Sequence, residues 1–187
     1  MRDGFLMAAE LEALGLASIG DNVQIDATAR LYGAERIEIG SDVRIDAYCV
    51  LSAGAEGISI GRHVHIAAFV FMAGSRRIEI GDFANISGRS SIYSSNDDYG
   101  GEALTGPTVP ETLRKVDSAP VTVGRHVIMG TGSVLLPGVT LGEGAAVGAL
   151  SIVKRDVPPF TIVAGPDGRT IGERKRDLLE LEQRLGS

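Results

Sequence analysis

Aliphatic residues recur every six positions in the stretch Ile78-Glu79-Ile80-Gly81-Asp82-Phe83-Ala84-Asn85-Ile86-Ser87-Gly88-Arg89-Ser90-Ser91-Ile92. This spacing is the strongest indication of the fold. The residue after each such aliphatic is nearly always small or acidic, and the residue four places after it is small or β-branched. The same columns of aliphatic residues run through the chain at Ile19, Ile25, Ile39, Ile45, Ile60, Ile66, Ile80, Ile86, Ile92, Val123, Met129, Leu135, Leu141, Val147 and Val153. Repeats of this kind are typical of a parallel β-helix.

A longer period of about three hexapeptides supports the same fold. Similar tetrapeptides open successive turns, among them Ile37-Glu38-Ile39-Gly40, Ile58-Ser59-Ile60-Gly61 and Ile78-Glu79-Ile80-Gly81. Each coil is therefore expected to be a triangle of three short strands that pair with the coils before and after it. An antiparallel sandwich also alternates apolar and polar residues, but it does not require glycine in a six-residue column. The sequence predicts an all-β solenoid over residues 18–165.

Three segments depart from the repeat within what we expect to be a single domain, residues 1–187. Residues 1–17, with the apolar run Phe5–Leu16, are expected to form a short helical cap over one end of the solenoid. Residues 93–120 form a long excursion rich in turn-forming residues and without aliphatic period, which favours a functional loop. Residues 166–187 are expected to hold a terminal helix over Ile171–Leu185, lying on the solenoid or on a neighbouring subunit.

Composition limits the classes of function. The 187 residues carry a formal net charge of −6, which disfavours a nucleic-acid partner. No apolar run is long enough to cross a bilayer and no signal peptide opens the chain, so we expect a cytoplasmic protein. The single cysteine, Cys49, falls in a column of small core residues and is expected to be structural.

Four stretches carry a resemblance to a known family. They are residues 85–99, Val-His-Ile-Ala-Ala at 64–68, Arg-Ile-Asp-Ala-Tyr-Cys-Val-Leu-Ser at 44–52 and Glu-Gly-Ala-Ala-Val-Gly-Ala-Leu-Ser at 143–151. With the hexapeptide columns, they make the chain resemble the hexapeptide-repeat acyltransferases, and most closely the N-acyltransferases of nucleotide-linked amino sugars of the anthrose-pathway type. The resemblance implies a left-handed β-helix, a homotrimer, an acyl-CoA donor and a nucleotide-linked sugar as acceptor. The family's usual Gly-x-Pro-Ala-Lys is replaced here by Gly165-Pro166-Asp167-Gly168-Arg169.

The excursion departs from the sugar O-acetyltransferases of this superfamily in one chemically important way. Where those enzymes carry a catalytic histidine, this chain has Asn96, Asp97 and Asp98. A carboxylate with a pKa near ~4 is a poor base for a sugar hydroxyl, but it can hold and orient an amine, which is already nucleophilic in its free form. We therefore predict that Asp97 and Asp98 are catalytic. Ser87, Tyr93, Asn96 and Tyr99 are predicted to bind the acceptor; ordinary turn chemistry is the alternative for the two acids.

The three histidines leave other interpretations open. His65 lies in the motif that matches the family, and we predict that it lines the acceptor pocket at a corner or takes a proton there. His63 and His126 both stand three places after an aliphatic and are expected to face outward on one side of the solenoid, two coils apart. If His65 or His126 were a base, a sugar O-acetyltransferase acting on a lipopolysaccharide or oligosaccharide would be the alternative. A γ-type carbonic anhydrase needs three converging histidines, and a structural or ice-binding solenoid needs a regular outward ladder; both fit the spacing less well.

The donor site follows from the resemblance. Coenzyme A is expected to lie along the carboxy-terminal coils between two subunits, where small residues allow its pantetheine arm to approach the backbone. The predicted cofactor-binding residues are Gly130, Gly148, Ala149, Ser151, Lys154, Arg155 and Arg169, with Arg174 as a further phosphate contact, and no metal is expected. The predicted function is transfer of an acetyl or short hydroxyacyl group from acyl-CoA to the amino group of a nucleotide-linked amino-deoxysugar, by direct attack in a ternary complex. The product would serve surface-glycan synthesis.

Overall fold

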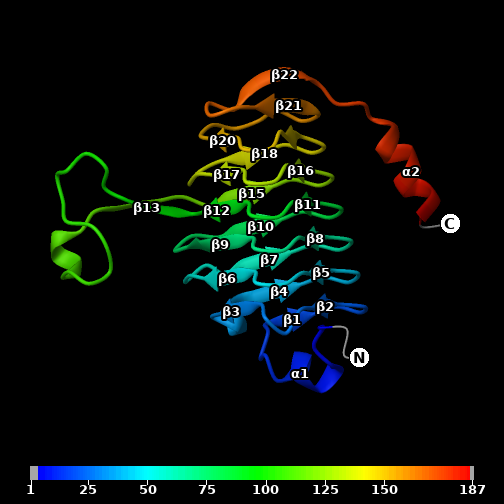
Figure 1. Ribbon diagram of the computed structural model, residues 1–187, viewed down its shortest axis with the longest axis horizontal. Coiled ribbons are helices and arrows are strands. Elements are labelled where there is room, and N and C mark those ends of the chain that lie inside the picture. The colour runs from blue at the N-terminus through cyan, green and yellow to red at the C-terminus, as the bar shows by residue number, and fades with distance from the viewer. Residues whose placement is uncertain (1–3, 186–187) are drawn as a thin grey trace.

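A computed structural model describes residues 4–185 and shows a left-handed parallel β-helix of about seven turns (Figure 1). Three sheets form its sides, and all their strands pair in parallel except the last one, β22 (Arg169–Glu173). The first sheet contains β1 (Ser18–Ile19), β4 (Ile37–Ile39), β7 (Ile58–Ile60), β10 (Ile78–Ile80), β15 (Val121–Val123) and β18 (Thr140–Leu141). The second contains β2 (Gln24–Ile25), β5 (Arg44–Ile45), β8 (His65–Ile66), β11 (Asn85–Ile86), β16 (Ile128–Met129), β19 (Ala146–Val147), β21 (Thr161–Ala164) and β22 (Arg169–Glu173). The third contains β3 (Arg30–Tyr32), β6 (Val50–Ala53), β9 (Phe71–Gly74), β12 (Ser91–Tyr93), β17 (Val134–Leu135) and β20 (Ile152–Val153).

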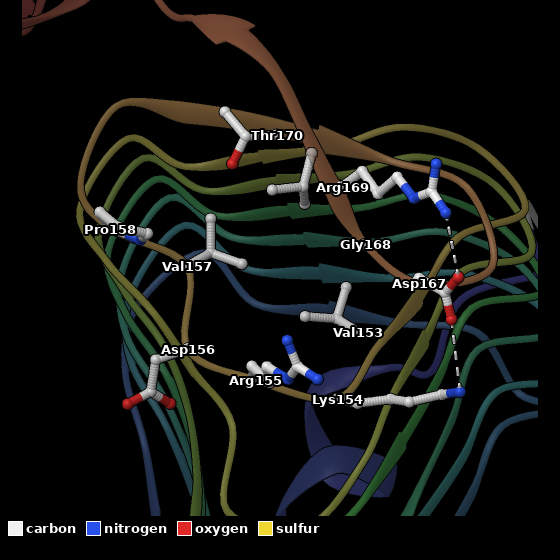
Figure 2. A pocket seen from close by; sticks show the side chains of 11 residues that line it. Val153, Lys154, Arg155, Asp156, Val157, Pro158, Asp167, Gly168, Arg169 and Thr170 are labelled. Atoms are coloured by element: carbon white, nitrogen blue, oxygen red, sulfur yellow. Dashed lines mark ion pairs between the residues drawn. The ribbon is translucent and has the colours of Figure 1, made fainter.

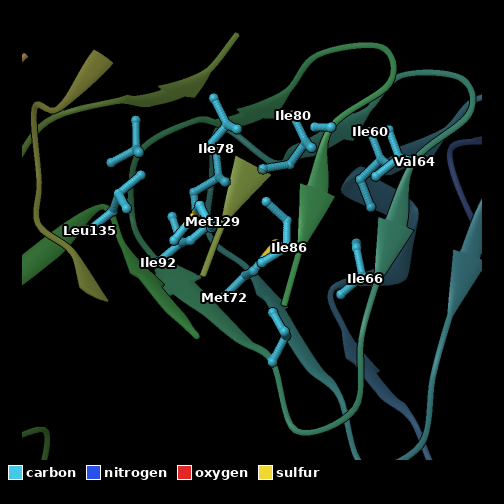
Figure 3. Close-up of a cluster of buried hydrophobic side chains, with 14 of the residues drawn as sticks. Ile60, Val64, Ile66, Met72, Ile78, Ile80, Ile86, Ile92, Met129 and Leu135 are labelled. Carbon is cyan, nitrogen blue, oxygen red and sulfur yellow. The ribbon is translucent and has the colours of Figure 1, made fainter. Parts of the chain in front are cut away.

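The aliphatic columns form one continuous core along the axis (Figure 3). Equivalent residues pair from coil to coil, as in Ile66↔Ile86↔Met129, so each side chain packs on its counterpart in the next coil. Ile66, Ile86 and Met129 have no exposed surface. Burial of an aliphatic side chain of this size contributes roughly 1.5–3 kcal/mol, and the repeat multiplies that gain along the chain. The predicted all-β solenoid fold is confirmed.

Most coils turn through left-handed backbone at two corners. At the first corner, between the first and second sheets, Asn22, Asp42, His63, Phe83 and His126 have φ between 55° and 59°. At the second corner, between the second and third sheets, Tyr48, Phe69, Arg89 and Leu150 have φ between 57° and 64°. All of these residues stand three places after a core aliphatic, so this position marks a corner that strains most side chains.

The amino-terminal cap is shorter than predicted. Helix α1 spans Ala8–Glu12 only, and Phe5 forms an isolated antiparallel bridge with Asp26 of the first coil. Leu6, Leu11 and Leu14 pack against the core, so the segment does cover the open end of the β-helix. Residues 1–3 of the predicted cap lie outside the described residues.

The carboxy-terminal prediction was wrong over residues 166–176. Ile171 lies in β22, which returns antiparallel to β21 and closes the second sheet. The helix α2 begins only at Asp177 and ends at Leu185. The last strand of a sheet has open N–H and C=O groups, and a hairpin partner satisfies them where a helix would not.

The excursion leaves the β-helix between β12 and β15, within the predicted bounds, and Figure 1 shows it projecting from one side. It is not without secondary structure. Strands β13 (Ser95–Asp97) and β14 (Val116–Ser118) pair as an antiparallel arm, and the short 3-10 helix η2 (Glu111–Leu113) lies beyond it. A second 3-10 helix, η1, spans Ala34–Arg36 in the second coil.

Candidate functional site

Ser87 lies on a line of residues that each follow an inward-facing aliphatic of the second sheet by one position. We call this line the serine column: Asp26, Asp46, Ala67, Ser87, Gly130, Gly148 and Ala164. The backbone N–H of each member from Asp26 to Gly148 donates to a carbonyl of the following coil, for example Ser87 N to Met129 O at 2.9 Å. Small neighbours on either side leave the partly exposed Ser87 open to a ligand lying along the column.

The glycines of the column are required by the fold itself. A Cβ placed on Gly130 would lie 2.5 Å from the backbone nitrogen of Ala149, and one on Gly148 would lie 2.9 Å from the Cβ of Ala164. Coil-to-coil packing therefore excludes larger residues there, whether or not a cofactor approaches. Ala149 is exposed, whereas Ser151 is fully buried, and its Oγ donates to Gly148 O and accepts from Gly165 N. The predicted contact of Ser151 with a cofactor is thus not supported by its position.

The two acids of the excursion have different surroundings. Asp98 acts as a turn residue: its carboxylate accepts from the backbone N–H groups of Gly100, Glu102 and Ala103 at 2.6–3.0 Å. These bonds, that from Gly100 foremost, hold the pKa of Asp98 below its ordinary value. Asp97 accepts one longer bond, from Gly106 N at 3.3 Å, and remains partly exposed. Asp97 is therefore better placed than Asp98 to meet a substrate.

The remaining predicted acceptor residues line the route from β12 into the arm. Tyr93 ends β12, and its ring is tilted against Phe71 with centroids 5.6 Å apart. Asn96 pairs with Asp117 across the arm, while Tyr99 is 93% exposed beyond it. Tyr93 and Asn96 thus lie close to Asp97 along the chain, and Tyr99 lies beyond the paired strands of the arm.

Ser87 and Asp97 do not meet within one chain. Ser87 precedes the second corner, whereas Asp97 follows the far end of β12. The three residues of β12 alone separate these places by roughly 10 Å, at about 3.3 Å per strand residue. Figure 1 shows the arm pointing away from the β-helix.

His65 belongs to a polar cluster on the outward side of the second sheet, not to a corner as predicted. Its Nε2 lies 2.8 Å from Asp46 Oδ2 and its Nδ1 lies 3.1 Å from Asn85 Oδ1. Arg44 Nε donates to the other oxygen of Asp46 at 2.7 Å. Partial burial opposes ionisation of Asp46, but the bonds from His65 and Arg44 outweigh it and lower its pKa. Both ring nitrogens of His65 therefore lie within hydrogen-bond distance of side chains on the neighbouring coils.

The other two histidines face the chain's own carboxy-terminal helix. His63 and His126 stack on opposite sides of Phe83, with centroids 4.8 and 4.9 Å away. His126 is only 8% exposed, and its Nε2 lies 2.7 Å from Glu182 of α2. The predicted outward column two coils apart is correct, but α2 covers His126. Within residues 4–185 no group of His, Cys, Asp and Glu side chains is arranged to hold a metal ion.

A basic cavity of about 540 Å³ opens at the carboxy-terminal end of the β-helix (Figure 2). Lys154, Arg155 and Arg169 line it together with Asp156 and Asp167. Lys154 and Arg169 lie 3.8 and 3.9 Å from Asp167, and all three cationic side chains remain exposed. Such cations can pair with phosphate groups.

Arg174 is not part of this cavity. Its guanidinium donates to the carbonyl oxygens of His126 and Gly144 at 2.6 and 3.2 Å, which ties the segment before α2 to the first corner. Its predicted role as a phosphate contact is therefore replaced by a structural one.

Sequence reasoning missed Tyr48, Phe69 and Arg89, which line the second corner beside the serine column. The sequence did contain a signal for them, because each stands three places after a core aliphatic. At the first corner, the first two coils hold Asn22 and Asp42 at the equivalent place, so bulky residues there are not required by the repeat.

No helix among the described residues has the length and apolar character needed to span a membrane. No family model matches the chain. It is 47% identical over 178 residues, 95% of its length, to an Escherichia coli dTDP-4-amino-4,6-dideoxy-D-glucose acyltransferase, of which it covers 93%.

Solved structures of AntD, an N-acyltransferase from Bacillus cereus, match over nearly the whole chain. A variant with one serine replaced, in complex with dTDP-4-amino-4,6-dideoxyglucose and coenzyme A, has a TM-score of 0.95 and 41% identity, covering 99% of this chain and 98% of that one. A complex with dTDP and 3-hydroxybutyryl-CoA has a TM-score of 0.93 and 42% identity, covering 97% and 96%. In a further variant, one aspartate is replaced, ten positions after that serine. Ser87 and Asp97 are also ten positions apart.

Proposed function

Because the chain belongs to the hexapeptide-repeat acyltransferases, in the branch of nucleotide-linked amino-sugar N-acyltransferases, we propose that it acylates the amino group of a dTDP-linked 4-amino-deoxysugar. The donor is an acyl-CoA that carries an acetyl or short hydroxyacyl group. The observation that carries the proposal is the 47% identity over 95% of the chain. It is supported by Ser87 and Asp97 at the spacing of the serine and aspartate replaced in AntD.

The chemistry is a direct attack within a ternary complex. The lone pair of the sugar amine forms the C–N bond at the thioester carbonyl, the C–S bond breaks, and CoA leaves as a thiolate. Asp97 orients the amine and accepts the proton that the nitrogen loses; this proton then passes to the thiolate or to solvent. Ser87 holds the acceptor beside the thioester.

The separation of Ser87 from Asp97 indicates that the site is shared between subunits. In a homotrimer, the arm of one subunit reaches the serine column of its neighbour and brings Asp97 to Ser87. The donor lies along the carboxy-terminal part of that column, with its phosphates toward Lys154, Arg155 and Arg169. We place the enzyme in the cytoplasm, and its product in surface-glycan synthesis.

The function is tested by mass spectrometry with acetyl-CoA and 3-hydroxybutyryl-CoA against dTDP-4-amino-4,6-dideoxyglucose. We expect an amide product with at least one donor. A matched dTDP-sugar with a hydroxyl in place of the amine should react much more slowly. Preferential acylation of the hydroxyl sugar would contradict N-acylation.

The residue assignment is tested by Asp97→Asn, which should lower kcat roughly 100-fold while the trimer persists. Asp117→Asn, on the paired strand of the same arm, is the matched control and should retain activity. Asp98→Asn should also reduce turnover, but together with a loss of order in the arm that hydrogen exchange detects. Unchanged rates in both the Asp97 and Asp98 variants would remove the arm from the site.

The shared site has its own test. Mixed trimers that combine Asp97→Asn chains with Ser87→Phe chains should regain activity, because one interface then holds both native residues. Trimers made from either variant alone should not. A lack of recovery in verified mixed trimers would place both residues in one subunit's site.

A further inference from the structure

The second corner carries an exposed ladder of stacked side chains, which we call the second-corner ladder: Tyr48, Phe69 and Arg89 on three successive coils. The rings of Tyr48 and Phe69 are 5.1 Å apart at an angle of 21°, and the Arg89 guanidinium lies 5.8 Å from the centre of the Phe69 ring. Tyr48 remains 56% exposed and Phe69 51% exposed. Exposed, stacked aromatic rings beside a cation form a surface suited to a planar ligand.

Folding alone does not account for these residues. Tyr48, Phe69 and Arg89 have φ of 60°, 64° and 60°, a left-handed backbone that is unfavourable for bulky L-residues. At the first corner, the first two coils place Asn22 and Asp42 in this conformation, and such residues adopt it more readily. Because the ladder gains little burial in return, its rings are placed for contact with something outside the chain.

The ladder runs beside the serine column. Tyr48, Phe69 and Arg89 each follow a member of that column, Asp46, Ala67 and Ser87, by two residues. Successive coils are about 4.8 Å apart, so Phe69 lies roughly one coil and Tyr48 roughly two coils from Ser87 along the axis. Both lie on the amino-terminal side of Ser87.

The acceptor is expected to bind on this amino-terminal side of Ser87. Under the proposed function, on which this inference rests, CoA occupies the column from Gly130 toward the basic cavity at the carboxy-terminal end. The acceptor must then extend from Ser87 in the opposite direction. A ribose and two phosphates separate its base from its sugar, a distance on the order of two coil heights.

We propose that the second-corner ladder is the nucleotide subsite: the pyrimidine base stacks on the Tyr48 end of the Tyr48–Phe69 pair, and Arg89 pairs with the diphosphate. Stacking on aromatic rings recognises the flat face of a base, and a guanidinium matches phosphate geometry. Arg89 lies on the coil of Ser87, and Phe69 and Tyr48 follow on the next two coils toward the amino terminus. The ladder therefore sets the affinity for the nucleotide part of the acceptor and takes no part in bond formation.

The test measures dTDP binding by calorimetry and acyl transfer by steady-state kinetics. Tyr48→Asn should weaken dTDP binding roughly tenfold, since stacking on one base contributes on the order of 1–3 kcal/mol. KM for the dTDP-linked amino sugar should rise by a similar factor with kcat within about twofold. Tyr48→Phe should restore binding because it keeps the stacking ring. Asparagine is chosen for the first variant because Asn22 adopts the same backbone conformation.

Two comparisons separate the base from the phosphates. The KM for the amino-sugar 1-phosphate, which lacks the base, should be the same in wild type and Tyr48→Asn. Arg89→Gln should weaken dTDP binding but leave thymidine binding unchanged. Tyr32→Asn is the matched control, because Tyr32 is another exposed tyrosine but lies on the third sheet. Its dTDP affinity should equal that of wild type.

The failure of this inference is distinguishable from failure of the proposed function. Normal turnover by wild type with unchanged dTDP affinity in Tyr48→Asn and Phe69→Asn would overturn the subsite alone. Loss of the native oligomer in Tyr48→Asn, seen by light scattering, would also overturn it and identify the ladder as a subunit contact. Tight dTDP binding by wild type that depends on Tyr48, without any acyl transfer, would support the subsite and reject the proposed function.

Discussion

At the first corner, the ring of Phe83 lies between His63 and His126, and the last helix packs over this stack. At the second corner, the rings of Tyr48 and Phe69 stack in the same way but face outward. Both sets of residues stand at the same place in the six-residue repeat and share the same left-handed backbone. The repeat therefore sets the positions at which bulky side chains point outward. Elements outside the repeat, such as α2, determine whether those side chains are covered.

The covering at the first corner is electrostatic as well as apolar. Glu182 of α2 contacts both His126 and Arg125, and the Arg125 guanidinium lies 5.5 Å from the centre of the Phe83 ring. Arg174 holds the chain just before the helix by its bonds to His126 and Gly144. The aromatic stack at the first corner is therefore covered by α2, whereas the ladder at the second corner remains exposed.

The largest expected effect comes from removing the central ring of the covered stack. Phe83→Ala should lower the free energy of unfolding by roughly 2 kcal/mol, because Phe83 loses contacts with two imidazoles and one guanidinium. Chemical denaturation at a fixed protein concentration measures the change. A loss below about 0.5 kcal/mol would show that α2 does not depend on the stack.

The covered histidine should make stability depend on pH. Burial first, and then the charges of Arg125 and Arg174, lower the pKa of His126 from its ordinary value of 6.5, although Glu143 and Asp82 oppose this shift. The unfolded chain then binds a proton more readily than the folded one. Stability from His126 is thus fully present above about pH 6.5 and is lost as the pH falls through the lowered pKa, by up to about 1.4 kcal/mol per pH unit.

Denaturation curves from pH 8 to pH 5 test this sign. His126→Phe retains a stacking ring but cannot titrate, so its stability should fall less steeply below pH 6.5 than that of the wild type. Identical slopes in the two proteins would contradict a lowered pKa.

A smaller effect is expected when the charge of the covering helix is removed. Glu182→Gln keeps the shape of the side chain and its contact with His126 but loses the ion pair with Arg125, at a cost of about 1 kcal/mol. Faster hydrogen exchange in residues 177–185 should accompany the loss. Glu180→Gln, on the exposed side of the same helix, provides the control and should change neither quantity.

The smallest effect on stability is expected at the open corner. Phe69→Asn removes an exposed ring and relaxes the left-handed backbone, so the free energy of unfolding should change by less than about 0.5 kcal/mol. Thermal unfolding beside Phe83→Ala makes the contrast direct. A loss as large as that of Phe83→Ala would mean that the second corner is also part of the core.

The sequence was sufficient for the parts of the molecule that depend on short spacing. The columns of Ile66, Ile86 and Met129 and the bounds of the excursion were predicted correctly, because coil-to-coil stacking makes the same demand on each hexapeptide. The sequence was misleading at Ile171, where leucines at helical spacing farther along suggested one long helix. Strand β22 forms there because the edge of β21 needs a partner, and no local pattern records that need.

The same distinction between local and long-range information applies to the candidate site. The choice of an acid at position 97 in place of a histidine is visible in the sequence and predicts amine chemistry. The different hydrogen bonding of Asp97 and Asp98 is not visible in the sequence, because it depends on which backbone N–H groups the loop directs at each carboxylate. The engagement of His65 by Asp46 and Asn85 likewise depends on three neighbouring coils.

The β-helix and its core columns could be read from the sequence alone, since they follow from a repeat whose physical demands are local and identical in every turn, and the motifs of the chain indicated its family. The tertiary structure was needed to show that Ser87 lies on the β-helix while Asp97 lies in the projecting arm, that α2 covers one aromatic stack, and that the other stays open beside the serine column. These outcomes depend on contacts between residues tens of positions apart, where packing and charge select one arrangement from many that the same local pattern allows.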